Sequence, residues 1–379
     1  MAEGGSPLTE WGKLEFAIIS GLRSLRDRYL QSVRGSKEQG SPAAITESLS
    51  DNADLRATSL CGLPVDLQLY IMSFLSPKDL CQLGMTSHHW YLMVQDRLLW
   101  RYFLLRDLPT WSSVEWQNVT DFGILNTSLC DSAEENTHDY MSFYLKNCPK
   151  ARRSMSARHP IYGAVTSFLQ SLIMQSEPRF AMFGPGLEQL DDSLFIRMMT
   201  SPDLLPVISL LQRQNHGVGW GAMFQFDNQK FKILVLHFSC RSQQEHVGIN
   251  TIFLPTISGV EQQATLYTLT PQVKEVCKVV DGFIYVANAE SHKRHNREDE
   301  IARILAMTDP LLGPQRRPFL VLSCVTQPGH SRIPALFMAH ELCLNKLNRP
   351  WMVQNTEAST LAGLLDGIEW ILGEVGRKF

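Results

Sequence analysis

Residues that could do chemistry are present in this sequence, but their spacing matches no catalytic or metal site. His340-Glu341 lacks the second histidine of the HExxH helix that binds zinc. A GxGxG run at 217–221 enters an apolar segment, which favours a loop before a strand over the helix of a dinucleotide site. His292 lies in a charged run, as is typical of a solvated loop. The sequence therefore predicts no catalytic residue and no metal ligand.

Gly184 and Gly186 are the glycines best placed to hold a phosphate, since they follow an apolar run. A phosphate-binding loop, GxxxxGK[ST], supplies backbone N–H groups, a lysine and a hydroxyl for magnesium. Here the lysine and the hydroxyl are missing, Glu188 would repel phosphate, and Pro185 removes a backbone donor. The apolar run at 319–325 is not followed by the base-reading Asn-Lys-x-Asp. We therefore expect no nucleotide hydrolysis and no cofactor, with a nucleotide-binding GTPase switch kept as an alternative function.

The composition is that of an ordinary globular protein, with 44% hydrophobic and 19% charged residues. A formal net charge of -3 gives no strong field to attract nucleic acid or an anionic membrane. No apolar run reaches the roughly 18 residues of a membrane span, and the first residues lack the pattern of a secretory signal. None of the 8 cysteines lies in a CxxC pair, which favours free thiols in a reducing compartment. We expect a cytoplasmic protein, with the nucleus as an additional location.

Helical signals crowd the segment 59–108. Leu63-Pro64 can open a first helix, because proline is tolerated in a first turn. Ser76 and Ser87 can cap the helices that follow. Apolar residues recur at spacings of three and four, as one face of a helix requires. So small a unit cannot bury all of its large apolar side chains, and some of them must face a partner.

The order Leu-Pro, Ile and Leu, Asp-Leu, Trp and Trp in this segment resembles the F-box. F-boxes dock on the Skp adaptor, which links them to a cullin and a RING subunit. The resemblance implies a non-catalytic substrate receptor of an SCF (Skp-cullin-F-box) ubiquitin ligase. It places Trp90 in the core of the motif and implies adaptor contacts from Leu63, Pro64, Leu67, Ile71, Leu75, Leu80 and Trp100. An ordinary small helical domain is the alternative.

Short apolar runs alternate with helical patterns from 161 to 379. Strands are predicted at 180–184, 222–226, 231–238, 282–288, 319–325 and 351–354, and helices at 164–175, 187–200, 271–280, 298–307, 333–347 and 359–375. Nearly continuous apolar strands separated by helices predict a mostly parallel sheet that is covered on both faces. Asp227-Asn228 predicts a hairpin turn, so one edge of this sheet should be antiparallel.

Two stretches of this region, VVDGFIYVANAESHKR and PWMVQNTEASTLAGLLDGIEWILGEV, resemble small GTPases of the ADP-ribosylation-factor type. Because the nucleotide-binding residues are missing, the resemblance implies an atypical, pseudo-GTPase domain. The whole chain resembles F-box proteins in which such a domain binds clients. That resemblance implies protein substrates that include a telomeric repeat-binding factor and D-type cyclins, delivered for ubiquitination and proteasomal degradation. A non-degradative scaffold is a further alternative.

The remaining segments are predicted to link and regulate these domains. Residues 1–58 read as a flexible N-terminus with an amphipathic helix at about 8–33, whose stripe packs on the F-box or self-associates. The resemblance implies a homodimer and phosphorylation near the N-terminus, for which Ser6 is the candidate. Residues 109–160 read as a linker. The expected fold class is multidomain, with an all-α F-box and linker region before an α/β small-GTPase-like domain.

Overall fold

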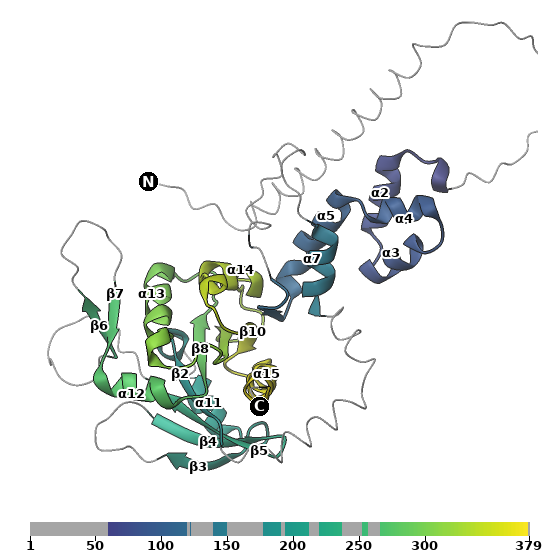
Figure 1. Ribbon diagram of the computed structural model, residues 1–379. Helices are drawn as coiled ribbons and strands as arrows, with labels where there is room; N and C mark the ends of the chain where they lie inside the picture. The colour runs from purple at the N-terminus through teal and green to yellow at the C-terminus, as the bar shows by residue number, and fades with distance from the viewer. Residues whose placement is uncertain are drawn as a thin grey trace, which may run out of the picture. The chain divides into compact units, whose positions relative to one another are not determined.

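The computed structural model describes residues 60–119, 122, 139–149, 177–190, 194–211, 220–236, 252–256 and 266–377 (Figure 1). The chain divides into two compact units, one of residues 1–107 and 123–144 and the other of residues 108–122 and 145–379. Ser6 and the helices predicted at 8–33 and 164–175 lie outside the described residues. Within the described part, no helix has the length and apolar character to cross a membrane.

The first unit is helical, as the sequence predicts. A short 3-10 turn, η1 (Leu60–Gly62), precedes α2 (Val65–Ser73), α3 (Pro77–Gly84), α4 (His88–Val94) and α5 (Arg97–Asp107), and the first residues of α7 (Tyr140–Asn147) complete the unit. Both predicted caps are present, because the side chain of Ser76 accepts from the Asp79 N–H and that of Ser87 from the Trp90 N–H.

A buried aromatic and aliphatic cluster holds these helices together. Trp100 and Phe103 of α5 are fully buried. The indole N–H of Trp100 donates to the Val94 carbonyl at 2.6 Å, so this polar atom has a partner inside the core. Tyr144 of α7 packs on Trp100, with 5.5 Å between ring centroids, and donates to Asp107 at 2.6 Å. The unit therefore has a rigid core of its own.

The second unit is built on an eight-stranded sheet in the order β1-β10-β9-β8-β2-β5-β4-β3. Its strands are β1 (Ser113–Glu115), β2 (Arg179–Phe183), β3 (Val207–Leu211), β4 (Trp220–Phe226), β5 (Gln229–Val235), β8 (Gly282–Asn288), β9 (Phe319–Val325) and β10 (Trp351–Glu357). The five strands from β10 to β5 pair in parallel, whereas β1, β4 and β3 pair antiparallel. The mostly parallel sheet is confirmed, and so is the antiparallel turn at Asp227-Asn228, where both residues have positive φ.

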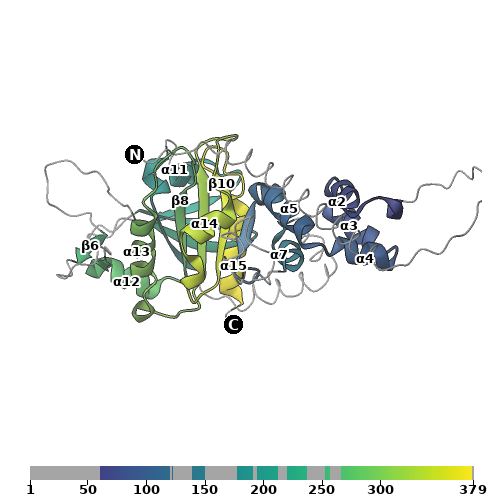
Figure 2. The ribbon, with the colours of Figure 1, turned by 90° about the horizontal axis from the view of Figure 1, so that it is seen from above.

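Helices cover this sheet on both faces. They are α10 (Gly186–Gln189), α11 (Leu194–Thr200), α12 (Pro271–Val279), α13 (Arg297–Met307), α14 (Ala335–Glu341) and α15 (Leu364–Gly376), with the 3-10 turns η2 (Leu108–Thr110), η3 (Pro310–Leu312) and η4 (Leu344–Lys346). The core on one face joins α11 and α15 to alternate strand residues such as Ile284 and Val286. On the other face Tyr285 donates to Glu300 of α13. A separate hairpin of β6 (Phe253–Thr256) and β7 (Leu266–Leu269) lies beside α13 (Figures 1 and 2).

Several predicted boundaries were wrong. The supposed linker at 109–160 contributes β1, which pairs with β10, and also α7. The predicted helix at 187–200 consists of α10 and α11, and the one at 333–347 ends with α14 before a separate turn, η4. The edge strand β3 was missed. β1 and β3, of three and five residues, carry too little periodicity to be recognised, and their pairing is fixed by other segments of the chain.

Gly363 gives a test of the turn that leads into α15. Its φ is 78°, and a Cβ at this position would overlap the Asn355 carbonyl oxygen. We expect Gly363→Ala to lower the free energy of unfolding by about 2 kcal/mol or more, since strain and overlap act together. Gly373 lies in α15 with open space around its Cα, so Gly373→Ala should stabilise by roughly 0.5–1 kcal/mol. Denaturant titrations would measure both, and equal effects would contradict this account of the turn.

Candidate functional site

A row of exposed apolar side chains runs along α2. Leu67, Tyr70, Ile71 and Phe74 are spaced i, i+3, i+4 and i+7, so they share one face, and each is between 37% and 70% exposed. The opposite face of the helix is buried through residues such as Met72. We call these four residues the α2 stripe. A continuous apolar row on a small helical unit is the kind of surface that a protein partner covers.

The α2 stripe is held in place by polar contacts behind it. Gln68 is buried and donates to the carbonyls of Leu63 at 2.6 Å and Cys61 at 3.3 Å. Its side-chain oxygen lies 2.8 Å from Nε2 of His89 in α4. Arg106 of α5 donates to the Ser73 carbonyl at the end of α2. These bonds fix the orientation of α2, so the stripe does not have to be ordered when a partner binds.

The residues predicted to contact an adaptor do not all reach the surface. Pro64, Leu67 and Ile71 are exposed, and Leu63 and Leu75 are half-buried. Leu80 and Trp100 are 0% exposed, so their prediction as partner-facing residues was wrong. They fill the interior of the helical unit because large apolar groups on short helices are needed first to hold those helices together.

One further predicted residue lies where it was expected, and two exposed aromatic residues were missed. Trp90 is buried, as predicted for a core residue. Tyr70 and Phe74 were missed, although their spacing from Leu67 and Ile71 is visible in the sequence. Their rings lie 4.9 Å apart in an edge-on arrangement.

The place where an open α/β sheet would bind a nucleotide is the topological switch point between β2 and β8. Gly184 and Gly186 follow β2 at this point, and the φ of Gly184 is 127°. A Cβ on Gly184 would lie 2.5 Å from the Val286 carbonyl oxygen, and one on Gly186 would lie 2.7 Å from Cγ1 of Val286. Glycine is therefore required here because the loop packs directly on β8.

A polar cluster around Glu290 fills the adjoining end of the sheet. The Glu290 side chain is 2% exposed and accepts from the Thr326 N–H at 3.0 Å, the Thr326 hydroxyl at 2.5 Å and His330 Nδ1 at 3.3 Å. It also pairs with Lys293 at 2.8 Å, and Lys293 donates to the Gln189 carbonyl. Burial acts to raise the pKa of Glu290, but the hydrogen bonds from Lys293, Thr326 and His330 outweigh it and lower that pKa to about 2. The cluster ties the loop after β2 to the ends of β8 and β9.

Comparison with known proteins identifies relatives over nearly the whole chain. A family model described as F-box-like matches residues 60–106. F-box only protein 4 of Bos taurus is 52% identical, over 98% of this chain and 95% of that protein. The Mus musculus protein of the same name is 51% identical, over 98% of this chain and 96% of that protein. The Homo sapiens protein is 52% identical, over 98% of this chain and 95% of that protein.

The Glu290 cluster predicts a specific dependence of stability on pH. A carboxylate whose pKa falls from 4.5 to about 2 on folding contributes stability above pH 4.5, and that contribution disappears as the pH falls to about 2. We expect Glu290→Gln to be less stable than the wild type by about 3 kcal/mol at pH 7. The difference should shrink progressively between pH 4.5 and pH 2. Unfolding titrations across this range would measure it. Glu369→Gln, at an exposed position of α15, is the control, and a difference that is independent of pH would rule out this role of Glu290.

Proposed function

This chain belongs to the F-box only protein 4 family, and on that basis we propose that it is the substrate-recognition subunit of an SCF ubiquitin ligase. Its F-box would dock on the Skp adaptor, and through it on a cullin and a RING subunit. The rest of the chain would present client proteins for ubiquitination and proteasomal degradation. The α2 stripe is the observation that supports adaptor docking most directly.

The α2 stripe has the properties of a central contact in a protein interface. It presents two aromatic and two aliphatic side chains on a helix that is already fixed by Gln68 and Arg106. Burial of each side chain would contribute about 1.5–3 kcal/mol to the binding free energy, before the entropy and desolvation costs of association are subtracted. We assign adaptor contacts to Leu63, Pro64 and Leu75 as well, since they lie at or near the surface of the same helical segment.

Such a receptor would act without chemistry of its own. Holding a client next to the ubiquitin-charged enzyme raises the effective concentration of the two reactants, which is the source of the rate gain. The loop that packs on β8 and the Glu290 cluster at the switch point favour this role over that of a nucleotide-binding switch. Glu188, next to this loop, further disfavours a bound phosphate. The domain is on this view a pseudo-GTPase that serves as a rigid support.

Edge strand β3 is our candidate for the surface that binds clients. Among the described residues β3 pairs only with β4, so its outer edge has free backbone groups. Ile208 and Leu210 of β3 and Trp220 of β4 are exposed, Leu210 to 67%. The opposite edge strand, β1, has only three residues. An extended client segment can add to an apolar edge through main-chain hydrogen bonds, with side chains giving specificity. A telomeric repeat-binding factor and D-type cyclins remain the proposed clients.

Adaptor docking can be tested with a double substitution on the α2 stripe. Ile71→Ala with Phe74→Ala should weaken binding of the Skp adaptor about 30- to 100-fold, because two central apolar contacts are removed. The variant should unfold within about 2 °C of the wild type, since both side chains are exposed. Calorimetric titration of the purified chain with the adaptor measures the affinity. Leu311→Ala is the control, as Leu311 is the most exposed of the large apolar residues described and lies in the other unit. Unchanged affinity in the double variant would remove the proposed docking surface.

Client binding can be tested at β3 in the same way. Leu210→Lys places a charge on the exposed edge and should weaken binding of a telomeric repeat-binding factor at least tenfold, while adaptor affinity stays the same. Leu311→Lys adds the same charge at an exposed site outside the sheet and should have no effect. Binding assays with the client, followed by ubiquitination in the assembled ligase, would measure both. If the two lysine variants behave alike, clients bind elsewhere.

A further inference from the structure

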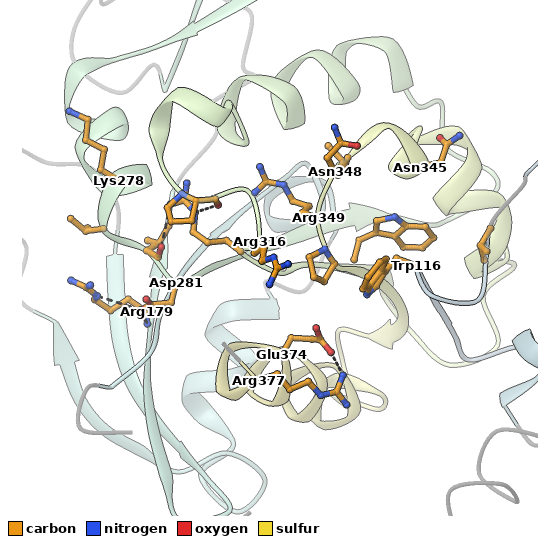
Figure 3. Close-up of a pocket in the computed structure, with 18 residues that line it drawn as sticks. Trp116, Arg179, Lys278, Asp281, Arg316, Asn345, Asn348, Arg349, Glu374 and Arg377 are labelled. Atoms are coloured by element: carbon orange, nitrogen blue, oxygen red, sulfur yellow. Dashed lines mark hydrogen bonds and ion pairs between the residues drawn. The ribbon is translucent and has the colours of Figure 1, made fainter. Parts of the chain in front are cut away.

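A pocket lies at the end of the sheet opposite to Glu290. It has a volume of about 1070 Å³ and opens at the starts of β2, β8 and β10 (Figure 3). The C-terminal ends of α12 and α15 and the segments after η3 and η4 complete its wall. All of these elements belong to the second unit. The pocket is thus independent of the F-box and of edge strand β3.

Positive charge dominates the lining of this pocket. Two acidic residues line it, and each has a cationic partner in the lining: Asp281 lies 3.7 Å from Arg179, and Glu374 pairs with Arg377. The cationic lining residues are Arg179, Lys278, Arg316, Arg317, Arg349 and Arg377. Lys278 pairs with Glu275, outside the lining, at 2.7 Å, so the lining cations without an ion pair among the described residues are Arg316, Arg317 and Arg349. This surplus of cations predicts that the pocket attracts anions.

Arg317 and Arg349 are both buried, and the positive charge of Arg317 acts on Arg349. Both guanidinium groups lie over the ring of Phe283, with 5.1 Å and 5.8 Å from the carbon of each group to the ring centroid. Arg317 donates to backbone carbonyls, including those of Val280 and Leu312. Burial, and next the charge of Arg317, lower the pKa of Arg349 to about 10. The charge of Asp281 acts on Arg317, but no carboxylate of the described residues forms an ion pair with either guanidinium group. An added anion would therefore stabilise these two like charges.

Arg349 also has an unused hydrogen-bond donor. It is 7% exposed, and its Nη2 donates to the Thr308 carbonyl at 2.6 Å. Its Nη1 is buried and has no hydrogen-bond partner in the described part of the chain. A buried donor without a partner loses free energy on folding, which a ligand atom would restore. Arg349 lines the pocket, but its Nη1 is closed to solvent, so a ligand there would compensate the Arg349 charge and would bond Nη1 only after the side chain shifts.

Arg316 supplies a cation at the pocket surface. Its side chain is exposed, and among the described residues it has no ion pair or side-chain hydrogen bond. In the view of Figure 3 it lies between Arg349 and the Glu374–Arg377 pair. Planar guanidinium groups suit an oxyanion with several acceptor oxygens.

We propose that this pocket binds a phosphomonoester group, with Arg316 contacting its oxygens and Arg349 and Arg317 compensating its charge from behind. A phosphomonoester carries nearly two negative charges and three acceptor oxygens, and so matches the surplus of cations better than a carboxylate does. The group belongs either to a small phosphorylated molecule or to a phosphorylated segment of a protein. The assignment does not depend on adaptor docking.

Titration of the full-length chain with inorganic phosphate and with O-phosphoserine, at constant ionic strength, tests the proposal. We expect saturable binding of both, weakened about five- to tenfold by Arg316→Gln, because that variant removes a donor fork and a charge. Arg294→Gln is the matched control, since Arg294 is an exposed arginine outside the pocket lining. It should bind as the wild type does. Arg349→Gln removes one of the two compensating charges behind the site and should also weaken binding. A melting temperature for each variant would confirm that it is folded.

Peptides distinguish the two sources of the phosphate group. A short peptide with one phosphoserine that binds at least tenfold more tightly than O-phosphoserine, while its serine form does not bind, identifies a protein segment. Equal affinity of peptide and O-phosphoserine identifies a small molecule. Absence of saturable phosphate binding below about 10 mM, or equal losses in Arg316→Gln and Arg294→Gln, would overturn the proposal, because the positive charge would then have no selective ligand.

Discussion

Burial of β8 and β9 on both faces is the constraint on which the second unit depends. Every residue of these strands is buried. Apolar side chains therefore have to fill both faces of the central sheet, and polar groups are pushed to the ends of the strands. One end carries the Glu290 cluster, and the other carries the arginine-lined pocket. In the described part of the chain the outer strands of this sheet are left with an unpaired backbone edge, which is why we propose β3 as the edge for clients.

The helical unit also has to divide its large apolar side chains between its core and its surface. It uses Leu80, Trp90 and Trp100 to hold short helices together and leaves the α2 stripe outside. The sequence motif alone does not separate these two uses of a large apolar residue, because both need the same kind of side chain. The separation comes from packing, which sets each position either inside the cluster or on its surface.

The sequence was most informative where the physical signal is local. Long apolar runs such as 282–288 and 319–325 correctly indicated buried parallel strands, and Ser76 and Ser87 correctly indicated helix starts. The spacing of the α2 stripe was equally local and could have been used. The arginine-lined pocket had no such signal, since its residues are spread from Trp116 to Arg377 and meet only through the order of the strands. Strand β1 was not predicted for the same reason, since its pairing partner β10 lies far away in the sequence.

The pairing of β1 with β10 joins segments that are made far apart in time. Asn355 donates to the Trp111 carbonyl across 244 positions of the chain. At a synthesis rate of roughly 5–20 residues per second, β1 leaves the ribosome about 12–50 s before its partner strand exists. The helical segment from α2 to α5 is complete well before that moment, because its contacts are between neighbours in sequence. Helices α2 to α5 can therefore fold before β10, the strand that pairs with β1, has been synthesised.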